Sequence, residues 1–341
     1  MRKLLAAAMV LLPLTSVAQM VKVTPVESER RIDITVDGKP FTSYMWPTTL
    51  EKPVLYPLTA PDGTTVTRGY PLKPQKNERT DHPHHAGLWF NYGNVNGFDF
   101  WNNSDAIKPE QKPKMGSVHH TKIVSTHSGQ GKGDLTVESI WTNGAGQDVL
   151  RETTQYVFGV KNGVRYIDRI GKLTALEKIT FNDDKEGVLG IRVARWLESP
   201  TEKGGTFLDA SGNPTQVAAV DNSIATGVYL TSEGIEGDKV WSTRGRWCVL
   251  GGHTPEGKKE AIAIIDNPKN PGYPTYWHAR GYGLFAANPL GAHIFNPKAE
   301  PFNYTVEKGK TVTFTYRVLL SSSPLTSDEM NHEADAFAKQ Y

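Results

Sequence analysis

The sequence contains a single cysteine, so an intrachain disulfide cannot form. Net charge is also scarce, because 38 Lys and Arg residues stand against 36 Asp and Glu residues and leave a formal charge of +2. Without a strong positive field the chain has no long-range attraction for nucleic acid, and we expect no nucleic-acid partner. After the first 18 residues no apolar run is long enough to span a bilayer, which excludes a multi-span membrane protein.

Glycine and proline are plentiful, with 32 and 22 residues among 341. Both residues disfavour helix interiors, so this content argues against a helical bundle. A hydrophobic content of 38% and a charged content of 22% are those of a folded globular protein. The lone thiol, Cys248, lies between Trp247 and Val249. This setting is more typical of a small buried apolar group than of a nucleophile.

The first residues predict export. Arg2 and Lys3 precede an apolar block at residues 4–14, and the small residues 16–18 form a cleavage site before Gln19. The alternative is a buried N-terminal helix, but a basic flank, a short apolar block and a cleavage site rarely coincide in such a helix. We predict a signal peptide at residues 1–18, a single domain at residues 19–341, and a periplasmic or secreted protein.

Alternating apolar and polar residues dominate the rest of the chain. Residues 32–36 alternate and run into Asp37-Gly38, while residues 156–160 alternate and run into Asn162-Gly163. Both dipeptides adopt positive φ easily, so each predicts a hairpin. The most regular alternation, at residues 311–320, predicts a long strand. Further β-like runs lie at residues 189–196, 247–250 and 261–265, separated by Gly, Pro and Asn clusters.

One convincing helix is expected at the end of the chain. Thr326 and Glu329 have the spacing of a capping box, and Met330, Ala334 and Phe337 recur at helical intervals along residues 327–341. We expect this helix to pack outside the β-structure and assign it no functional role. The predicted fold is all-β, a large antiparallel β-sandwich with a C-terminal helix.

The most informative motif spans residues 81–90, Asp-His-Pro-His-His-Ala-Gly-Leu-Trp-Phe. Its proline disfavours a central strand, so the imidazoles are expected on a loop that enters a strand at residues 88–92. Histidine titrates near neutral pH, which suits acid/base catalysis. We therefore name His84 and His85 as candidate catalytic residues, Asp81 as a carboxylate that orients an imidazole, and Trp89 as a stacking surface for substrate.

Two other interpretations of this motif stay open. Neutral imidazoles from His82 and His84, or from His84 and a distant histidine, could bind zinc or another divalent metal ion, although no metalloprotease-type spacing is present. Alternatively, the histidines satisfy only backbone groups of the loop.

A second cluster occupies residues 274–285. In an extended conformation His278, Arg280 and Tyr282 share one face, and the glycines between them leave the other face open to close packing. Arginine can hold an anionic or keto oxygen, tyrosine can donate a proton, and Trp277 can stack on a sugar ring. We name the first three as catalytic candidates and Trp277 as substrate-binding. The alternative is a solvated strand face.

Three more residues are assigned to substrate binding. Asn288 and His293 flank a turn that would return His293 to the mouth of the same site. Arg192 is the third, and either Arg192 or Arg195 is expected to project into a central cleft and pair with an acid. Glu198 is the natural candidate for a carboxylate base, although an Arg/Glu ion pair at the surface is the simpler interpretation.

Four segments together resemble a known family: residues 81–90, 93–101, 190–194 and 276–289. They resemble an uncharacterised family of secreted bacterial proteins that is often labelled "methane oxygenase PmoA", and the resemblance covers residues 21–320. The methane monooxygenase subunit of that name is a multi-span membrane protein, whereas this chain has no span after its leader. The sequence therefore does not predict a methane monooxygenase.

The resemblance implies an all-β protein from bacteria that degrade polysaccharides, with a fold similar to the super-sandwich of galactose mutarotases. In mutarotases a His acid and a Glu base act across a sugar ring. Here the acid would be His84, His85 or His278, and the base would be Glu198 or Asp81, although the mutarotase motifs are not matched residue by residue.

Three functional hypotheses follow. The first is an enzyme that acts on a carbohydrate or glycoside through histidine acid/base chemistry, by hydrolysis, elimination or epimerisation. The second is a non-catalytic carbohydrate-binding protein that uses its 8 Trp and 13 Tyr residues as platforms. The third is a metal-dependent enzyme with the same histidines as ligands to a divalent metal.

Overall fold

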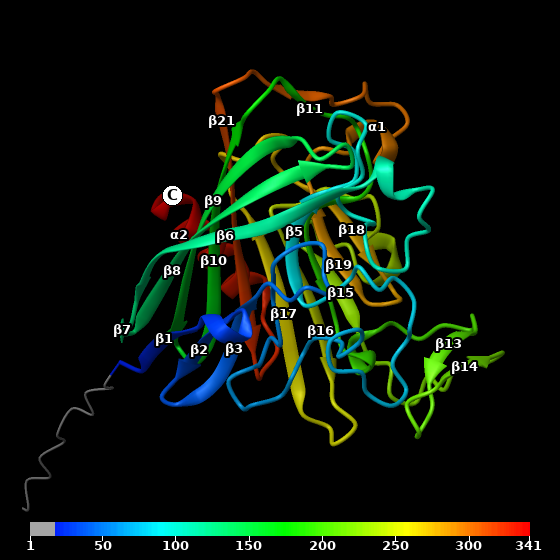
Figure 1. The fold of residues 1–341 in the computed structure, drawn as a ribbon. Coiled ribbons are helices and arrows are strands. Elements are labelled where there is room, and N and C mark those ends of the chain that lie inside the picture. The colour runs from blue at the N-terminus through cyan, green and yellow to red at the C-terminus, as the bar shows by residue number, and fades with distance from the viewer. Residues whose placement is uncertain (1–17) are drawn as a thin grey trace, which may run out of the picture.

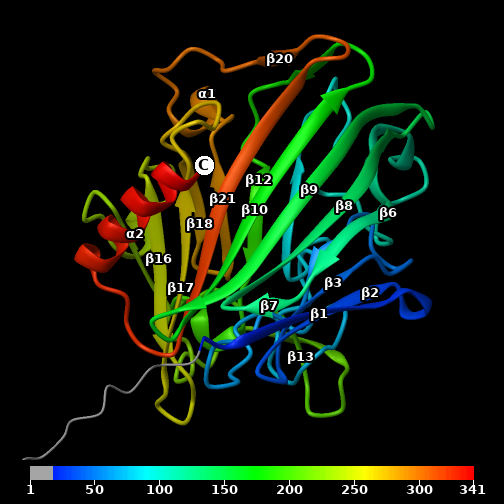
Figure 2. The same cartoon turned by 90° about the vertical axis from the view of Figure 1, so that its left-hand side faces the viewer.

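The computed structural model describes residues 18–341. The predicted signal peptide therefore lies almost entirely outside the described residues. Two large antiparallel sheets face each other, as Figures 1 and 2 show. Within residues 18–341 no helix combines the length and the apolar character that a membrane crossing requires.

The first sheet has nine strands. In spatial order they are β18 (Tyr276–Arg280), β19 (Leu284–Asn288), β12 (Gly187–Arg192), β5 (Leu88–Tyr92), β4 (Val54–Leu55), β3 (Lys39–Met45), β2 (Arg31–Val36), β1 (Met20–Val26) and β7 (Gly129–Gln130).

The second sheet has eight strands, and its long central members cross the view in Figure 2. In spatial order they are β15 (Val228–Thr231), β16 (Trp247–His253), β17 (Lys259–Asp266), β21 (Thr311–Ser321), β10 (Val164–Ala175), β9 (Asp148–Lys161), β8 (Lys132–Asn143) and β6 (Gly116–His127).

Two small hairpins and several short helices complete the fold. The hairpins pair β11 (Ile179–Phe181) with β20 (Tyr304–Val306), and β13 (Gly205–Leu208) with β14 (Pro214–Val217). The helices are α1 (Ala292–Phe295), α2 (Ser327–Gln340) and the 3-10 turns η1 (Glu27–Glu29), η2 (Lys112–Lys114), η3 (Arg195–Leu197) and η4 (Gly237–Val240). The β13–β14 hairpin projects from the lower right of Figure 1, away from both sheets.

The turns form where the sequence predicts them. Asp37 and Gly38 both have positive φ and reverse the chain between β2 and β3. Asn162 and Gly163 do the same between β9 and β10. Positive φ at both central positions gives the turn the twist of its flanking strands.

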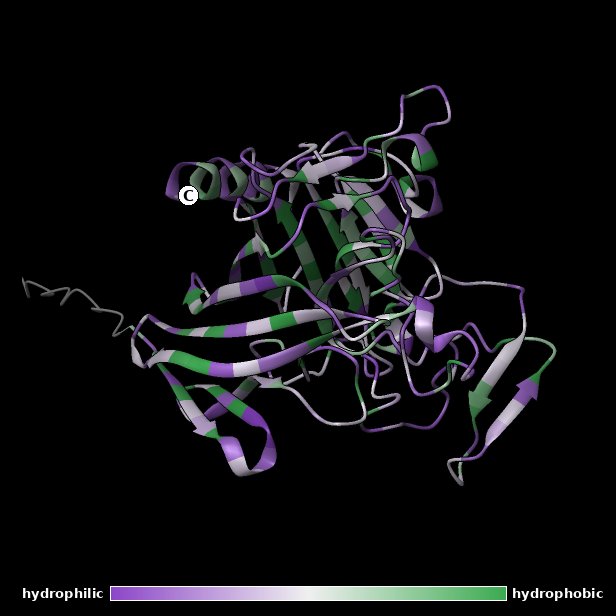
Figure 3. Ribbon diagram, turned by 45° about the horizontal axis from the view of Figure 1, so that its top comes forward, coloured by the Kyte–Doolittle hydropathy of each residue, from purple (hydrophilic) through white to green (hydrophobic). Residues whose placement is uncertain are grey.

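The core lies between the sheets. Figure 3 shows hydrophobic residues, in green, along the strands of these sheets. On β21 the alternate residues Val312, Phe314, Tyr316, Val318 and Leu320 all enter this core, as the period of two predicts. The lone thiol is fully buried in the same core. The predicted all-β antiparallel sandwich is confirmed.

Helix α2 packs on the outer face of the eight-stranded sheet. Thr326 and Glu329 form the predicted capping box, in which each side chain binds the backbone N–H of the other residue. Met330, Ala334 and Phe337 then contact Trp247 and its apolar neighbours on the sheet. The predicted C-terminal helix and its position are confirmed.

The β-run expected at residues 189–196 is shorter than predicted. Strand β12 ends at Arg192, because the next backbone N–H groups leave the ladder: Val193 donates to the carbonyl of Gly283 and Ala194 to that of Val66. The 3-10 turn η3 follows at Arg195. This change of direction separates the side chains of Arg192 and Arg195, which enter different clusters.

Candidate functional site

The outer face of the nine-stranded sheet, at its β18–β19–β12–β5 end, collects most of the predicted site residues. A small apolar cluster that includes Trp89, Trp101 and Leu284 lies on this face. The loop of residues 81–87 crosses it before the chain enters β5 at Leu88, as the sequence predicts.

The loop is held by a residue that the sequence analysis did not select. The Arg68 side chain is 1% exposed and donates hydrogen bonds to four loop carbonyls, those of Arg79, Asp81, His82 and His85. A guanidinium presents five donors in a fixed plane, which suits it to fix several carbonyls at once. Arg68 therefore sets the path of the histidine motif.

Asp81 joins this loop to the sheet. Its Oδ1 accepts from Arg68 Nη1 at 3.0 Å and from Arg192 Nη2 at 2.6 Å, so Arg192 pairs with an acid as predicted. Burial alone would raise the pKa of Asp81, but the hydrogen bond with His82 and the charges of Arg192 and Arg68 together hold it below its usual range. The carboxylate is therefore ionised at neutral pH.

His82 is the most exposed imidazole of the motif. Its Nδ1 lies 3.0 Å from Asp81 Oδ2, and 40% of its side chain is exposed. The ring is parallel to two others, 5.1 Å from the Tyr282 ring and 4.9 Å from the His85 ring between centroids. His82 thus has an orienting carboxylate, fixed ring faces and access to solvent.

His85, a predicted catalytic candidate, is enclosed. It is 1% exposed, its Nε2 accepts from Trp101 Nε1 at 3.2 Å, and its other nitrogen faces Arg192 at 3.3 Å. Burial, the neighbouring His84 and the arginines lower its pKa well below the usual value, so the ring is neutral. Its second face stacks on Trp89 at 5.0 Å. The His85 ring therefore stacks on both His82 and Trp89 and helps to hold the His82 ring in place.

His84 is also largely enclosed, with an exposed fraction of 8%. Its Nε2 has no hydrogen-bond partner among residues 18–341. Burial, with the nearby charge of Lys52, lowers the pKa of His84 to about 2. Lys52 itself is buried, donates to the His84 carbonyl at 2.7 Å, and has a pKa lowered to about 7 by burial. An imidazole that resists protonation so strongly is a poor general acid at neutral pH.

An open pocket of about 550 Å³ lies beside His82. Its lining includes Asp81, Tyr282, Arg280, Trp241 and Asp238. The Arg280 guanidinium lies 4.5 Å from the centre of the Trp241 ring and 5.8 Å from that of Tyr282. Burial raises the pKa of Tyr282 to about 12, so its hydroxyl keeps its proton at neutral pH. The pocket therefore combines an aromatic surface, a fixed cation and a proton donor.

His278 and Arg280 point to the same side of β18, as their alternation predicts, but only Arg280 lines the pocket. His278 is 2% exposed, and its Nδ1 donates to the Lys185 carbonyl at 2.9 Å. Burial and the charges of Lys185 and Arg280 lower its pKa to about 3. Its ring contacts Trp241 at 5.0 Å between centroids. His278 therefore positions the Trp241 platform and is withdrawn from the pocket.

Glu198 is not the surface ion pair that the sequence suggested. It is 1% exposed, and its Oε2 accepts from Arg79 at 3.0 Å and from Arg195 at 3.2 Å. Burial raises its pKa, while the charges of Arg192, Arg195 and Arg79 oppose that shift. One oxygen of Glu198, Oε2, is therefore held by two arginines in a buried ion-pair cluster.

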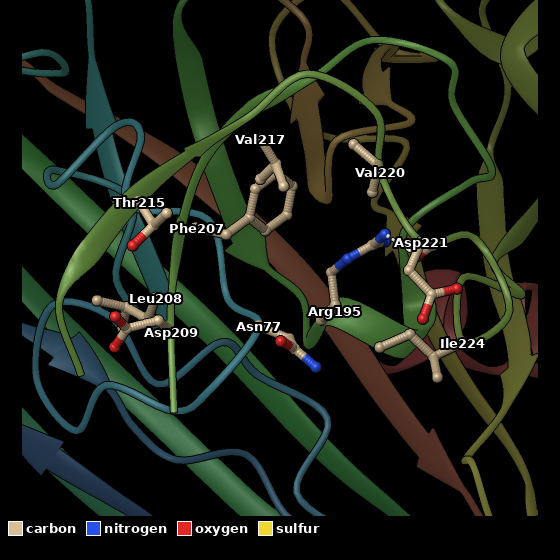
Figure 4. Close-up of a pocket in the computed structure, with 10 residues that line it drawn as sticks. All are labelled: Asn77, Arg195, Phe207, Leu208, Asp209, Thr215, Val217, Val220, Asp221 and Ile224. Atoms are coloured by element: carbon tan, nitrogen blue, oxygen red, sulfur yellow. Dashed lines mark hydrogen bonds between the residues drawn. The ribbon is translucent and has the colours of Figure 1, made fainter. Parts of the chain in front are cut away.

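A second pocket, of about 220 Å³, lies under the β13–β14 hairpin (Figure 4). Its walls are mostly apolar, with Arg195 and Asp221 at one side. The two pockets have a common wall, because Arg79, which lines the first, lies 4.6 Å from the ring of Phe207, which lines the second. The two pockets therefore lie on either side of the Arg79–Phe207 contact.

Four predicted substrate-binding residues lie away from the pocket. Trp277 is fully buried in the core between the sheets, and Trp89 is 2% exposed beneath His85. Asn288 is fully buried and donates to the Asp184 carbonyl. His293 is exposed on α1, where its Nδ1 lies 2.8 Å from the Ala299 carbonyl. None of the four lines the pocket.

The aromatic platform, Trp241, was missed by the sequence analysis. It follows the short turn η4 and belongs to no alternating or helical pattern. Only its contacts with His278 and Arg280, both on β18, identify it as part of the site. Arg79 and Lys203, which also line the pocket, were missed for the same reason.

The motif does not assemble a metal centre in this structure. Among residues 18–341 no group of three or more His, Cys, Asp or Glu side chains is placed to hold a metal ion. His82 points toward Asp81, His84 is surrounded by cations, and His85 is bonded to Trp101. These surroundings give the three imidazoles separate partners.

Sequence comparison identifies one family: a family of unknown function, DUF6807, matches residues 31–335. No curated protein matches the chain.

Among solved structures, the chain is similar to the GH36 α-galactosidase AgaB from Geobacillus stearothermophilus, with 11% identity and a TM-score of 0.43 over 90% of this chain and 42% of that one. It is also similar to a galactose 1-epimerase from Lactobacillus acidophilus NCFM, with 13% identity and a TM-score of 0.34 over 91% of this chain and 100% of that one. A putative aldose 1-epimerase from Escherichia coli K12 is similar too, with 9% identity and a TM-score of 0.31 over 89% of this chain and 99% of that one. The chain spans about two fifths of the α-galactosidase, and likeness at this level decides nothing about activity.

Proposed function

The chain belongs to the DUF6807 family, whose function is unknown, and we propose that it is a carbohydrate-active enzyme that binds a sugar beside Trp241 and transfers protons through His82. The observation that supports this most strongly is that Asp81 and Tyr282, which both line the 550 Å³ pocket, lie against the His82 imidazole. We also propose export to the periplasm or the medium, on the strength of the N-terminal residues alone.

Sugar binding is supported by the composition of the pocket. A sugar ring presents apolar C–H faces and a rim of hydroxyl groups, so it needs a flat aromatic surface surrounded by polar groups. Trp241 supplies the surface, and Arg280, Asp81 and Asp238 supply polar groups around it. A volume of about 550 Å³ is within the range of small-molecule sites.

Proton transfer is supported by the geometry of His82. Asp81 Oδ2 lies 3.0 Å from His82 Nδ1, and its charge favours the tautomer that carries a proton there, which leaves Nε2 to accept one. Parallel rings on both faces prevent the imidazole from turning. In this arrangement His82 acts as general base, and its imidazolium is stabilised by Asp81 when it returns the proton.

Tyr282 is the second proton-transfer group. Its ring is stacked on His82, and its hydroxyl has a pKa of about 12, so it enters the reaction protonated. A base and an acid on neighbouring parallel rings serve the same side of a bound sugar. Hydrolysis, elimination and epimerisation all use a general acid and a general base.

A panel of neutral and charged glycosides, incubated with the purified protein in D₂O and followed by proton NMR, tests the proposal. Hydrolysis releases new reducing ends, elimination creates vinylic protons, epimerisation by deprotonation at carbon incorporates deuterium there, and anomeric epimerisation speeds interconversion of the two anomers. We expect turnover of at least one member, with a loss of about 100-fold or more in His82→Asn.

The matched control is His127→Asn, because His127 also pairs with an aspartate, Asp134 at 3.2 Å, but does so on the exposed strand β6. Equal turnover by His82→Asn and His127→Asn would refute the assigned role of His82. Binding of a sugar that Trp241→Ala abolishes, with no turnover of any member, would instead establish the non-catalytic carbohydrate-binding protein.

A further inference from the structure

Positive charge is in excess around the pocket. Four arginines lie beneath it, Arg68, Arg79, Arg192 and Arg195, each at most 7% exposed. They meet three carboxylates. Asp81 is shared by one arginine pair, Glu198 is shared by the other, and Glu78 uses its oxygens to accept from three backbone N–H groups.

A buried cation without its own carboxylate is costly, because desolvation is not offset by a partner. The effect is visible at Arg68, whose pKa is lowered to about 9 by burial and by the neighbouring charge of Arg192. The Arg192 side chain is fully buried and its Nε has no hydrogen-bond partner among the described residues. An anion in the pocket would offset this charge.

Two further cations line the same pocket. The Arg280 guanidinium lies over the Trp241 ring, 4.5 Å from its centre, and no oxygen within residues 18–341 accepts a hydrogen bond from it. Lys203 is exposed at the rim. The one other acidic side chain of the pocket lining, Asp238, is exposed and cannot balance both. The charge excess of the buried arginines therefore continues to the pocket surface.

We propose that the sugar bound in this pocket carries an anionic group, which Arg280 holds through its free N–H donors while the sugar ring lies against Trp241. This inference rests on the proposed function and specifies its substrate class. A guanidinium fork matches the paired oxygens of a carboxylate, a sulfate or a phosphate.

Isothermal titration calorimetry with D-glucuronate, D-glucose 6-phosphate, D-glucose 6-sulfate and D-glucose tests the inference. We expect at least one charged sugar to bind about tenfold or more tightly than glucose, and which one does so distinguishes a carboxylate from a phosphate or a sulfate. We expect Arg280→Gln to reduce the preference to about twofold or less, and Arg280→Lys to give an intermediate value, because lysine retains the charge but not the fork.

Arg244→Gln is the matched control. Arg244 also lies over an aromatic ring, 4.9 Å from Tyr276, but it is exposed outside the pocket. Thermal melting of each variant separates lost binding from lost folding.

Three outcomes would overturn the inference, and they differ in whether they also refute the carbohydrate site. If glucose binds as tightly as every charged sugar and Trp241→Ala weakens them all equally, the anionic preference is refuted while the carbohydrate site stands. If no sugar of either kind binds, the carbohydrate site is refuted with it. A preference that persists unchanged in Arg280→Gln would also overturn the inference.

Discussion

Replacement of Asp81 by asparagine tests whether the buried arginines and the His82 imidazole depend on the Asp81 carboxylate. The carboxylate of Asp81 accepts from Arg68 and Arg192 and lies 3.0 Å from His82 Nδ1. Asparagine has nearly the same shape but no charge. The substitution therefore leaves two buried guanidinium groups without their shared carboxylate and removes the group that fixes the His82 tautomer.

The expected loss of stability follows from burial. Removing one partner of a buried ion pair costs about 3–5 kcal/mol, because the remaining charge is uncompensated. The Asp81 side chain is 36% exposed, so water screens part of this effect, and we take about 2–3 kcal/mol as the expected loss. With an unfolding entropy of about 0.7 kcal/mol/K for 341 residues, the melting temperature should fall by about 3–4 °C.

Differential scanning calorimetry of Asp81→Asn measures this shift, with Asp134→Asn as the control. Asp134 pairs with His127 on the surface, where the loss should be below about 0.5 kcal/mol and the melting temperature should change by less than about 1 °C. If Asp81→Asn melts within about 1 °C of the unmodified protein, the buried arginines do not depend on Asp81, and the charge argument for the pocket fails.

Three further predictions concern other parts of the fold. Burial and the carboxylate of Asp62 raise the pKa of Glu260 from 4.5 to about 7, so the folded state loses stability as pH rises from 4.5 through 7. In urea titrations the free energy of unfolding of Glu260→Gln should therefore exceed that of the unmodified protein by about 1–2 kcal/mol at pH 8 and equal it at pH 4. Cys248 is fully buried and burial raises its pKa well above the usual value, so intact-mass analysis should show no alkylation by iodoacetamide until denaturant is added. Thr326→Ala removes the cap of α2 and should cost about 1 kcal/mol in the same urea titrations; an unchanged midpoint would show that packing of α2 on the sheet, without the cap, holds the helix.

Local sequence signals account for most of the fold. Period-two alternation places β21, the dipeptides Asp37-Gly38 and Asn162-Gly163 place two hairpins, and Thr326 with Glu329 places the start of α2. Each signal acts through neighbours within a few residues, so it can be recognised in the chain alone. The motif of residues 81–87 was likewise correctly expected on a loop that enters β5.

The site was predicted less completely because its geometry depends on distant residues. Which histidine of the motif faces solvent is decided by Arg68 and by Arg192, which is 111 residues from Asp81 along the chain. His82 also has a positive φ of 46°, which no pattern in the sequence indicates. The motif and its loop position were therefore predictable, but His84 and His85 were named as catalytic candidates instead of the more exposed His82.

The aromatic residues show the same limit. Trp277 and Trp241 are equally plausible platforms by residue type, but β18 alternates so that Trp277 enters the core while His278 and Arg280 hold Trp241 at the pocket. The partners of Trp241 are about 40 residues away in the chain. Only the folded arrangement separates the two tryptophans.

The most direct test of the central claim is a crystal structure of the protein soaked with D-glucuronate. The account predicts a sugar in the 550 Å³ pocket, with one ring face against Trp241 and an atom within about 3.2 Å of His82 Nε2. A sugar bound only elsewhere on the molecule, or one that stacks on Trp241 with no atom within hydrogen-bond reach of His82, would contradict it.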